Sequence, residues 1–125
     1  MYGQTNDHDP ISIVRSANGK PGDPTMHLSL VAGIDPGRIM RAFIIRPNET
    51  AKRGRMMSEH DGEEILFVLT GKIGLLIGNR KEVLKPGDCV QFDSTMPHKI
   101  IALTKAPASA LVIIAATGIR GSHLR

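Results

Sequence analysis

The sequence predicts an all-β fold, and three observations favour this class. The apolar residues make up 41% of the chain, yet aromatic residues account for only 3%. The core must therefore be built mainly from Ile, Leu, Val, Ala and Met, a composition that favours strands. The 13 Gly and 8 Pro residues divide the chain into short segments, as tight turns in a sandwich or barrel require. No segment shows helical periodicity over three turns.

Short apolar runs alternate with turn signals along the chain. The turn pairs include Asn18-Gly19, Pro21-Gly22 and Pro86-Gly87, which are typical of breaks between strands. Gly71 and Gly87 are expected to be turn residues with unusual backbone angles. The expected strands are 11–15, 26–32, 38–46, 63–69, 72–77, 81–84, 88–92, 98–103 and 108–115. About nine short strands at this spacing predict a sandwich or barrel.

The length of 125 residues fits one domain, which we expect over residues 11–117. Residues 1–10 are expected to form a flexible leader and residues 118–125 a polar tail. No apolar run approaches the length needed to cross a bilayer, and the polar N-terminus does not resemble a secretory signal. Cys89 is the only cysteine, so no internal disulfide can form, and we expect a buried, inert thiol. These features predict a cytoplasmic protein without membrane contact.

The formal net charge is +4, which decides no partner by itself. The one dense basic cluster is Lys52, Arg53 and Arg55. It is expected to be a solvated loop or an anion-attracting rim of a pocket. No recognition helix and no aromatic ladder for base stacking is evident, so nucleic-acid binding by this segment is not predicted.

The residues that could carry chemistry are His60, Glu64 and His98. Imidazole nitrogen and carboxylate oxygen are suitable ligands for Fe, Mn, Ni or Zn, and two His with one carboxylate form the ligand set of many non-haem iron sites. On a strand, positions 58, 60 and 64 share one face if the pleat continues, but Asp61-Gly62 can disturb that phase. The spacing alone does not distinguish a metal site from surface charges.

The segments around these residues resemble the two cupin motifs. In the first motif, His60, Glu64 and Gly71 match the second His, the Glu and the Gly, whereas Ser58 replaces the first His. In the second motif, Gly87-Asp88 and Pro97-His98 match, whereas Asp93-Ser94-Thr95 replaces the central Pro-x-Gly and Ala102 the terminal Asn. The 15 residues between Gly71 and Gly87 equal the short spacer of small single-domain cupins. The resemblance spans roughly residues 40–116 and implies a double-stranded β-helix, or jelly-roll barrel.

The amino-acid sequence of these segments is similar to that of ligand-sensing cupin domains in Xre-type bacterial transcription regulators. The stretches Glu63–Gly71, Leu84–Asp88 and Phe92–His98 carry this likeness. The helix-turn-helix of such regulators is absent from this chain. The resemblance therefore implies an isolated regulator domain or a stand-alone relative, and the sequence does not separate these two.

The resemblance implies a domain that senses a small molecule, with His60, Glu64 and His98 as ligands of a divalent transition metal. Because a hydroxyl is a poor ligand for such a metal, Ser58 argues against a four-ligand site. The remaining triad resembles the three-ligand site of cupin epoxidases acting on phosphonates. The expected ligand-binding residues are Arg41, Arg55, Ser58 and Phe92, with the arginines attracting an anionic metabolite.

The resemblance also implies a homodimer, with Phe43, Ile44 and Ile45 contributing to its interface, and contact with DNA only through a helix-turn-helix outside this chain. One alternative is a stand-alone metal-dependent enzyme, such as a dioxygenase, epoxidase or isomerase. Another is a cupin that has lost its metal and serves as a structural or interaction module.

Overall fold

The computed structural model describes residues 10–16, 28–33, 35, 37–47, 62–105 and 107–115. These residues form eight strands and no helix, and none of them belongs to a membrane-spanning helix. The strands are β1 (Leu28–Ala32), β2 (Met40–Ile45), β3 (Glu63–Thr70), β4 (Ile73–Ile77), β5 (Arg80–Leu84), β6 (Cys89–Asp93), β7 (His98–Ala102) and β8 (Ser109–Ala115). Residues 1–9 of the expected leader and the whole expected tail, 118–125, lie outside the described residues.

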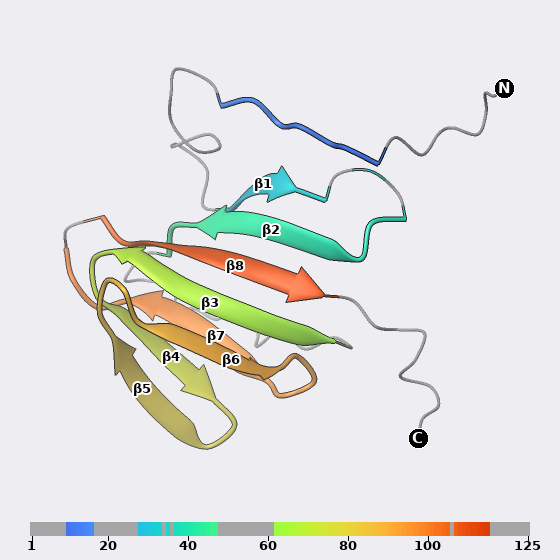
Figure 1. Cartoon of the computed structure of the whole chain (residues 1–125). Coiled ribbons are helices and arrows are strands. Elements are labelled where there is room, and N and C mark those ends of the chain that lie inside the picture. The colour runs from blue at the N-terminus through green and yellow to red at the C-terminus, as the bar shows by residue number, and fades with distance from the viewer. Residues whose placement is uncertain are drawn as a thin grey trace, which may run out of the picture.

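The strands form two antiparallel sheets (Figure 1). One sheet has the order β1-β2-β8-β3-β6, and the other has the order β5-β4-β7. Several strands that follow one another in sequence, such as β3 and β4 or β5 and β6, belong to different sheets. The chain thus passes repeatedly between the two layers, which confirms the all-β jelly-roll prediction.

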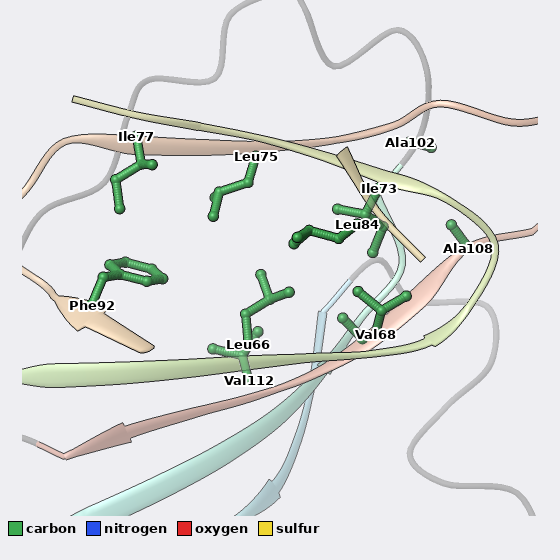
Figure 2. Close-up of a cluster of buried hydrophobic side chains, with 11 residues drawn as sticks. Leu66, Val68, Ile73, Leu75, Ile77, Leu84, Phe92, Ala102, Ala108 and Val112 are labelled. Atoms are coloured by element: carbon green, nitrogen blue, oxygen red, sulfur yellow. The ribbon is translucent and has the colours of Figure 1, made fainter. Parts of the chain in front are cut away.

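The core lies between the two sheets, and the period of two along each strand selects its members. In β3, Leu66 and Val68 are completely buried, whereas Phe67 and Leu69 on the opposite face are exposed. In the facing sheet, Ile73 and Leu75 are also completely buried. Figure 2 shows these side chains pointing toward one another, with Phe92 and Ile77 at one end of the cluster and Ala108 and Ala102 at the other.

Two expectations about individual segments are wrong. Residues 11–16 form no strand, and Ile11 and Ile13 remain 67% and 63% exposed, so their alternation buries no face. Cys89 is exposed, because Val90 and Phe92 take the inner positions of β6 and the pleat turns Cys89 outward. Phe43 and Ile45, which the resemblance places at a dimer interface, are partly buried and pack against the core, and the dimer itself stays a prediction.

Gly71 and Gly87 lie in the turns between strands and confirm the prediction that they have unusual backbone angles. Their surroundings differ, so their alanine variants can be compared. Gly71 and Gly87 have φ of +74° and +94°, a region that L residues with a side chain rarely adopt. A Cβ on Gly71 would lie 2.8 Å from the Cα and Cβ of Ala108, whereas a Cβ on Gly87 would have nothing within 4 Å. Gly71 therefore allows both a backbone angle and a close approach, and Gly87 allows only the angle.

We expect Gly71→Ala to destabilise the protein more than Gly87→Ala. The angle alone costs about 1–2 kcal/mol for a residue with a Cβ. The added contact with Ala108, which is 3% exposed, should raise the loss for Gly71→Ala to about 3 kcal/mol or more. Urea unfolding of the two variants measures the difference in free energy of unfolding. Equal losses would show that the contact with Ala108 relaxes without cost.

Candidate functional site

One row of residues crosses the inner face of the larger sheet near the start of β3. Glu64 pairs with Phe92 of β6 on one side and with Ile114 of β8 on the other, and Ile114 pairs with Arg41 of β2. Because directly paired residues point to the same face, the side chains of Arg41, Glu64 and Phe92 share the interior side. Adjacent strands are about 4.8 Å apart, and Arg41 is two strands away from Glu64. Their Cα atoms are therefore about 10 Å apart along this row.

The turn between β6 and β7 brings His98 to this row. The Asp93 carboxylate accepts hydrogen bonds from the Thr95 backbone N–H (3.0 Å) and hydroxyl (2.8 Å), and the Met96 N–H donates to the Asp93 carbonyl (3.0 Å). The Ser94 N–H donates to the Gly62 carbonyl (2.9 Å). The turn is thus tied both to itself and to the start of β3, and it fixes the position at which β7 begins with His98.

Glu64 and His98 form a buried pair. The Nε2 atom of His98 lies 3.4 Å from Oε2 of Glu64, and the two side chains are 3% and 4% exposed. The Ser94 hydroxyl, which belongs to a completely buried residue, donates to Oε1 of Glu64 at 3.4 Å. The Phe92 ring meets the imidazole edge-on, with 4.7 Å between the ring centroids. The pair therefore sits at the boundary between the polar row and the hydrophobic core.

The other imidazole nitrogen of His98 fixes which tautomer the ring adopts. Nδ1 lies 2.8 Å from the carbonyl oxygen of Met96, which can only accept, so Nδ1 carries a proton and donates. In the neutral ring, Nε2 then presents a lone pair toward the Glu64 carboxylate. Two acceptors that face each other require a cation between them or a proton on Nε2.

The surroundings of His98 raise its pKa above the ordinary value of 6.5. Burial acts to lower the pKa because it disfavours the charged ring. The hydrogen bond to Glu64, the hydrogen bond to the Met96 carbonyl and the charge of Glu64 act in the opposite direction and outweigh burial. In the absence of a metal, this site therefore holds a proton more tightly than a solvated histidine does.

The donor set of this pair suits a divalent transition metal. In a metal-binding histidine, the ring nitrogen that does not bind the metal usually donates its N–H to a carbonyl or carboxylate, as Nδ1 of His98 does to the Met96 carbonyl. Within residues 62–105 and the other described segments, no third His, Cys, Asp or Glu joins Glu64 and His98. The described residues thus supply two of the three expected ligands.

The structure brings together some of the residues expected from the sequence. Glu64, His98 and Phe92 are in contact, and Arg41 lies on the same row with an exposed side chain. The third expected metal ligand, His60, and the expected ligand-binding residues Arg55 and Ser58 lie outside the described residues.

Two supporting groups were not predicted from the sequence. Ser94 donates to Glu64, and the carbonyl of Met96 orients His98. Ser94 stands in the Asp93-Ser94-Thr95 run that replaces the glycine-containing part of the motif, and a hydroxyl in that place is a signal for such a role. The role of the Met96 carbonyl could not be predicted, because every residue has a backbone carbonyl and the sequence does not mark this one.

The family of the chain follows from the sequence match together with this fold. Residues 43–114, more than half of the chain, match the cupin domain family. The chain therefore belongs to the cupin family. No curated protein matches the sequence.

Several solved structures share the fold. Hydroxypropylphosphonic acid epoxidase from S. wedmorenis, in complex with fosfomycin, superposes with a TM-score of 0.64 and 19% identity, over 88% of this chain and 62% of that chain. A cupin superfamily protein from Desulfitobacterium hafniense DCB-2 gives a TM-score of 0.56 and 19% identity, over 71% of this chain and 75% of that chain.

A cupin 2 domain-containing protein from Halorhodospira halophila gives a TM-score of 0.56 and 21% identity, over 71% of this chain and 63% of that chain. Against structures of the epoxidase, this chain spans between 48% and 62% of the partner's length. At these identities, the likeness shows the fold alone.

We expect the stability of the metal-free protein to fall as the pH rises above neutrality. His98 binds its proton more tightly in the folded state than in the unfolded state, where its pKa is about 6.5. Its contribution is complete below 6.5 and is lost as the pH rises through the raised folded pKa. Urea unfolding in the presence of a chelator, between about pH 6 and pH 9, measures this slope.

The matched control is His98→Gln, which removes the titrating group and keeps an amide that can hydrogen-bond. The two proteins differ only at residue 98, so the difference between the two slopes measures the contribution of His98. Identical slopes for the two proteins would contradict the assigned environment of His98.

Proposed function

We propose that this chain is a cupin domain that binds a small anionic molecule next to a divalent metal and serves as the sensing part of a transcription regulator. The observation that carries the proposal is the buried pair of Glu64 and His98, in which Nε2 faces the carboxylate at 3.4 Å. A buried ionisable pair is costly to keep and is weak evidence for a stabilising role. A site role explains the burial of this pair better than packing does.

Glu64, His98 and His60 are the proposed metal ligands. His60 precedes Gly62 by two residues in the sequence, and Gly62 is held beside Ser94 by its carbonyl. Fe, Mn, Ni and Zn all suit this donor set. Structures of the epoxidase are described as containing Fe(II) or Co(II), which supports a metal of this kind. When bound, the metal would supply a Lewis-acid centre with open positions for a ligand.

Arg41 is the proposed partner of an anionic ligand. Its side chain shares the inner face with Glu64, two strands away, and it is exposed. Gly33 makes room for it, because a Cβ at that position would lie 2.7 Å from the Cγ of Arg41. A ligand with a carboxylate or phosphonate group could thus contact the metal at one end and Arg41 at the other. Arg55 and Ser58 complete the proposed ligand-binding set, with Phe92 as an apolar wall.

The regulatory role rests on the likeness of the sequence to Xre-type regulator domains. In this reading, DNA is contacted only through a helix-turn-helix, which the described residues do not form, and a homodimer transmits ligand binding. The outer face of the larger sheet is the proposed interface, because Phe67 and Leu69 on that face are 37% and 39% exposed. An upstream helix-turn-helix in the same reading frame would support this role, and its absence from the gene would remove the main support.

The second candidate function is a metal-dependent cupin enzyme. Its support is the likeness in fold to the phosphonate epoxidase, joined to the same Glu64–His98 pair. Both functions share the metal and the anionic ligand, and they differ in turnover. Dioxygen consumption by the iron-loaded protein in the presence of a bound organic acid or phosphonate would favour the enzyme. Saturable binding without turnover would favour the sensor.

The metal site is tested by matched carboxylate variants. We expect about one divalent metal per chain after reconstitution, and we expect Glu64→Gln, His98→Ala and His60→Ala each to weaken binding by about tenfold or more. Glu63→Gln is the control, because Glu63 is exposed on the opposite face of the same strand and should leave binding unchanged. Elemental analysis and calorimetry with Ni²⁺ measure the stoichiometry and affinity.

Failure of the wild-type protein to bind Fe, Mn, Ni or Zn would overturn the proposed metal site. Equal effects of Glu63→Gln and Glu64→Gln would show that the measured binding occurs elsewhere.

The anionic ligand is tested by a thermal-shift screen of small organic acids and phosphonates on the metal-loaded protein. For any compound that raises the Tm, we expect Arg41→Gln to weaken binding by about tenfold, the effect of losing about 1.4 kcal/mol. Arg46→Gln is the control, because Arg46 contacts Ser29 on the other face of the sheet. Equal affinity of the Arg41→Gln variant and the wild type would remove Arg41 from the site.

A further inference from the structure

A cavity of about 480 Å³ lies between β5 and β6. β5 is at the edge of the smaller sheet and β6 at the edge of the larger one, and the turn at residues 85–88 joins them. The residues that line the cavity come from β4, β5, β6 and the following turn, and none comes from β3 or β8. Glu64 and His98 are thus not among the residues that line the cavity, although their strand partners Phe92 and Ile77 are.

The inner walls of this cavity are apolar. Ile77 and Phe92, at one end of the cluster in Figure 2, line it together with Leu75, Leu84 and Val90. The volume lies within the range of about 300–1,000 Å³ found for small-molecule sites, which are also mostly apolar.

The polar residues at the rim are engaged with protein groups. Arg80 and Glu82 form an ion pair at 2.6 Å, and Gln91 donates to the carboxylate of Glu63 at 3.2 Å. Asp93 accepts both hydrogen bonds from Thr95. A charged ligand would have to compete with these contacts and lose its own hydration, whereas a neutral apolar molecule needs only the apolar walls.

The seam between β5 and β6 offers a way in. The two strands belong to different sheets, so no ladder of backbone hydrogen bonds joins them. A small separation of the two strands would therefore break no sheet pairing.

Two of the residues that line the cavity also hold His98. The Phe92 ring contacts the imidazole edge-on at 4.7 Å, and the Met96 carbonyl accepts from Nδ1 at 2.8 Å. A molecule that pushes on Phe92 or on the Met96 side chain therefore acts on groups that position His98.

We propose that the cavity between β5 and β6 binds a small, neutral, apolar molecule, and that its occupation changes the environment of His98. The ligand class follows from the apolar walls and the engaged rim. The functional importance of the link to His98 rests on the proposed function. Binding of a molecule in the cavity does not depend on it.

The proposal is tested with the neutral fluorophore N-phenyl-1-naphthylamine and the metal-free full chain. We expect saturable binding with one site per chain, and affinity weaker by about tenfold or more for the anionic 8-anilinonaphthalene-1-sulfonate. Val90→Trp fills the cavity and should lower the affinity by about tenfold or more. Val83→Trp is the matched control, because Val83 is 57% exposed on the adjacent strand and does not line the cavity.

If Val90→Trp does not fold, Met96→Trp replaces it, because Met96 lines the rim and is 40% exposed. The link to the site is read from the ¹⁵N and ¹H shifts of the His98 ring, assigned with His98→Gln. These shifts should change on saturation with the neutral probe in the wild type and in Val83→Trp.

Absence of saturable binding, or equal affinities for the two tryptophan variants, would overturn the proposal that the cavity binds a neutral apolar molecule. Binding without any change at His98 would overturn the link. A protein that binds the probe but no metal would refute the proposed metal-dependent function and leave the cavity in place, and a protein that binds metal but no probe would do the reverse.

Discussion

The register of β3 is the constraint on which both the core and the site depend. This strand pairs with β8 on one side and with β6 on the other, and its inner positions are Glu64, Leu66 and Val68. Because the side-chain period is two, a slip of one residue would place Glu63, Ile65 and Phe67 inside instead. The same pairing that buries Leu66 and Val68 therefore directs Glu64 at His98. Hydrophobic burial in the middle of the strand fixes the chemistry at its start.

The site end of this strand is held by the turn that precedes β7, because packing alone does not favour a carboxylate and an imidazole in the interior. Their loss of hydration is offset only if hydrogen bonds satisfy them. The Ser94 hydroxyl and the Met96 carbonyl do so for one atom of each partner, and the hydrogen bonds of Asp93 hold the turn that carries both groups.

The sequence predicted the parts of the structure that a strong local pattern marks. Seven of the eight strands overlap the expected segments closely because Gly and Pro bound them, and β1 does so over its described residues. Glu64 and His98 were predicted because they stand in two motifs at a family spacing. The paired strands that bring these motifs together were implied by the resemblance and not by periodicity.

The errors have a common physical origin. Residues 11–15 are apolar and alternate, but an isolated pattern does not say whether a neighbouring strand is present to bury one face. Cys89 was assigned by the usual burial of its residue type, whereas the phase of β6 is set by Val90 and Phe92. Ser94 was missed as a donor because its role depends on a turn whose hydrogen bonds reach across the chain to Gly62.

The residues of the inner face change in character from one end of the interior to the other. At the end near Ala108 and Ala102 the interior is apolar and tightly filled, and Gly71 allows a close approach there. At the other end, Phe92 and Ile77 are the last apolar residues before Glu64 and His98. An apolar pair at these two positions would pack without the cost of desolvation. The hydrophobic residues further along the same strands already form the core, so apolar packing does not account for the buried pair, whereas the proposed metal site does.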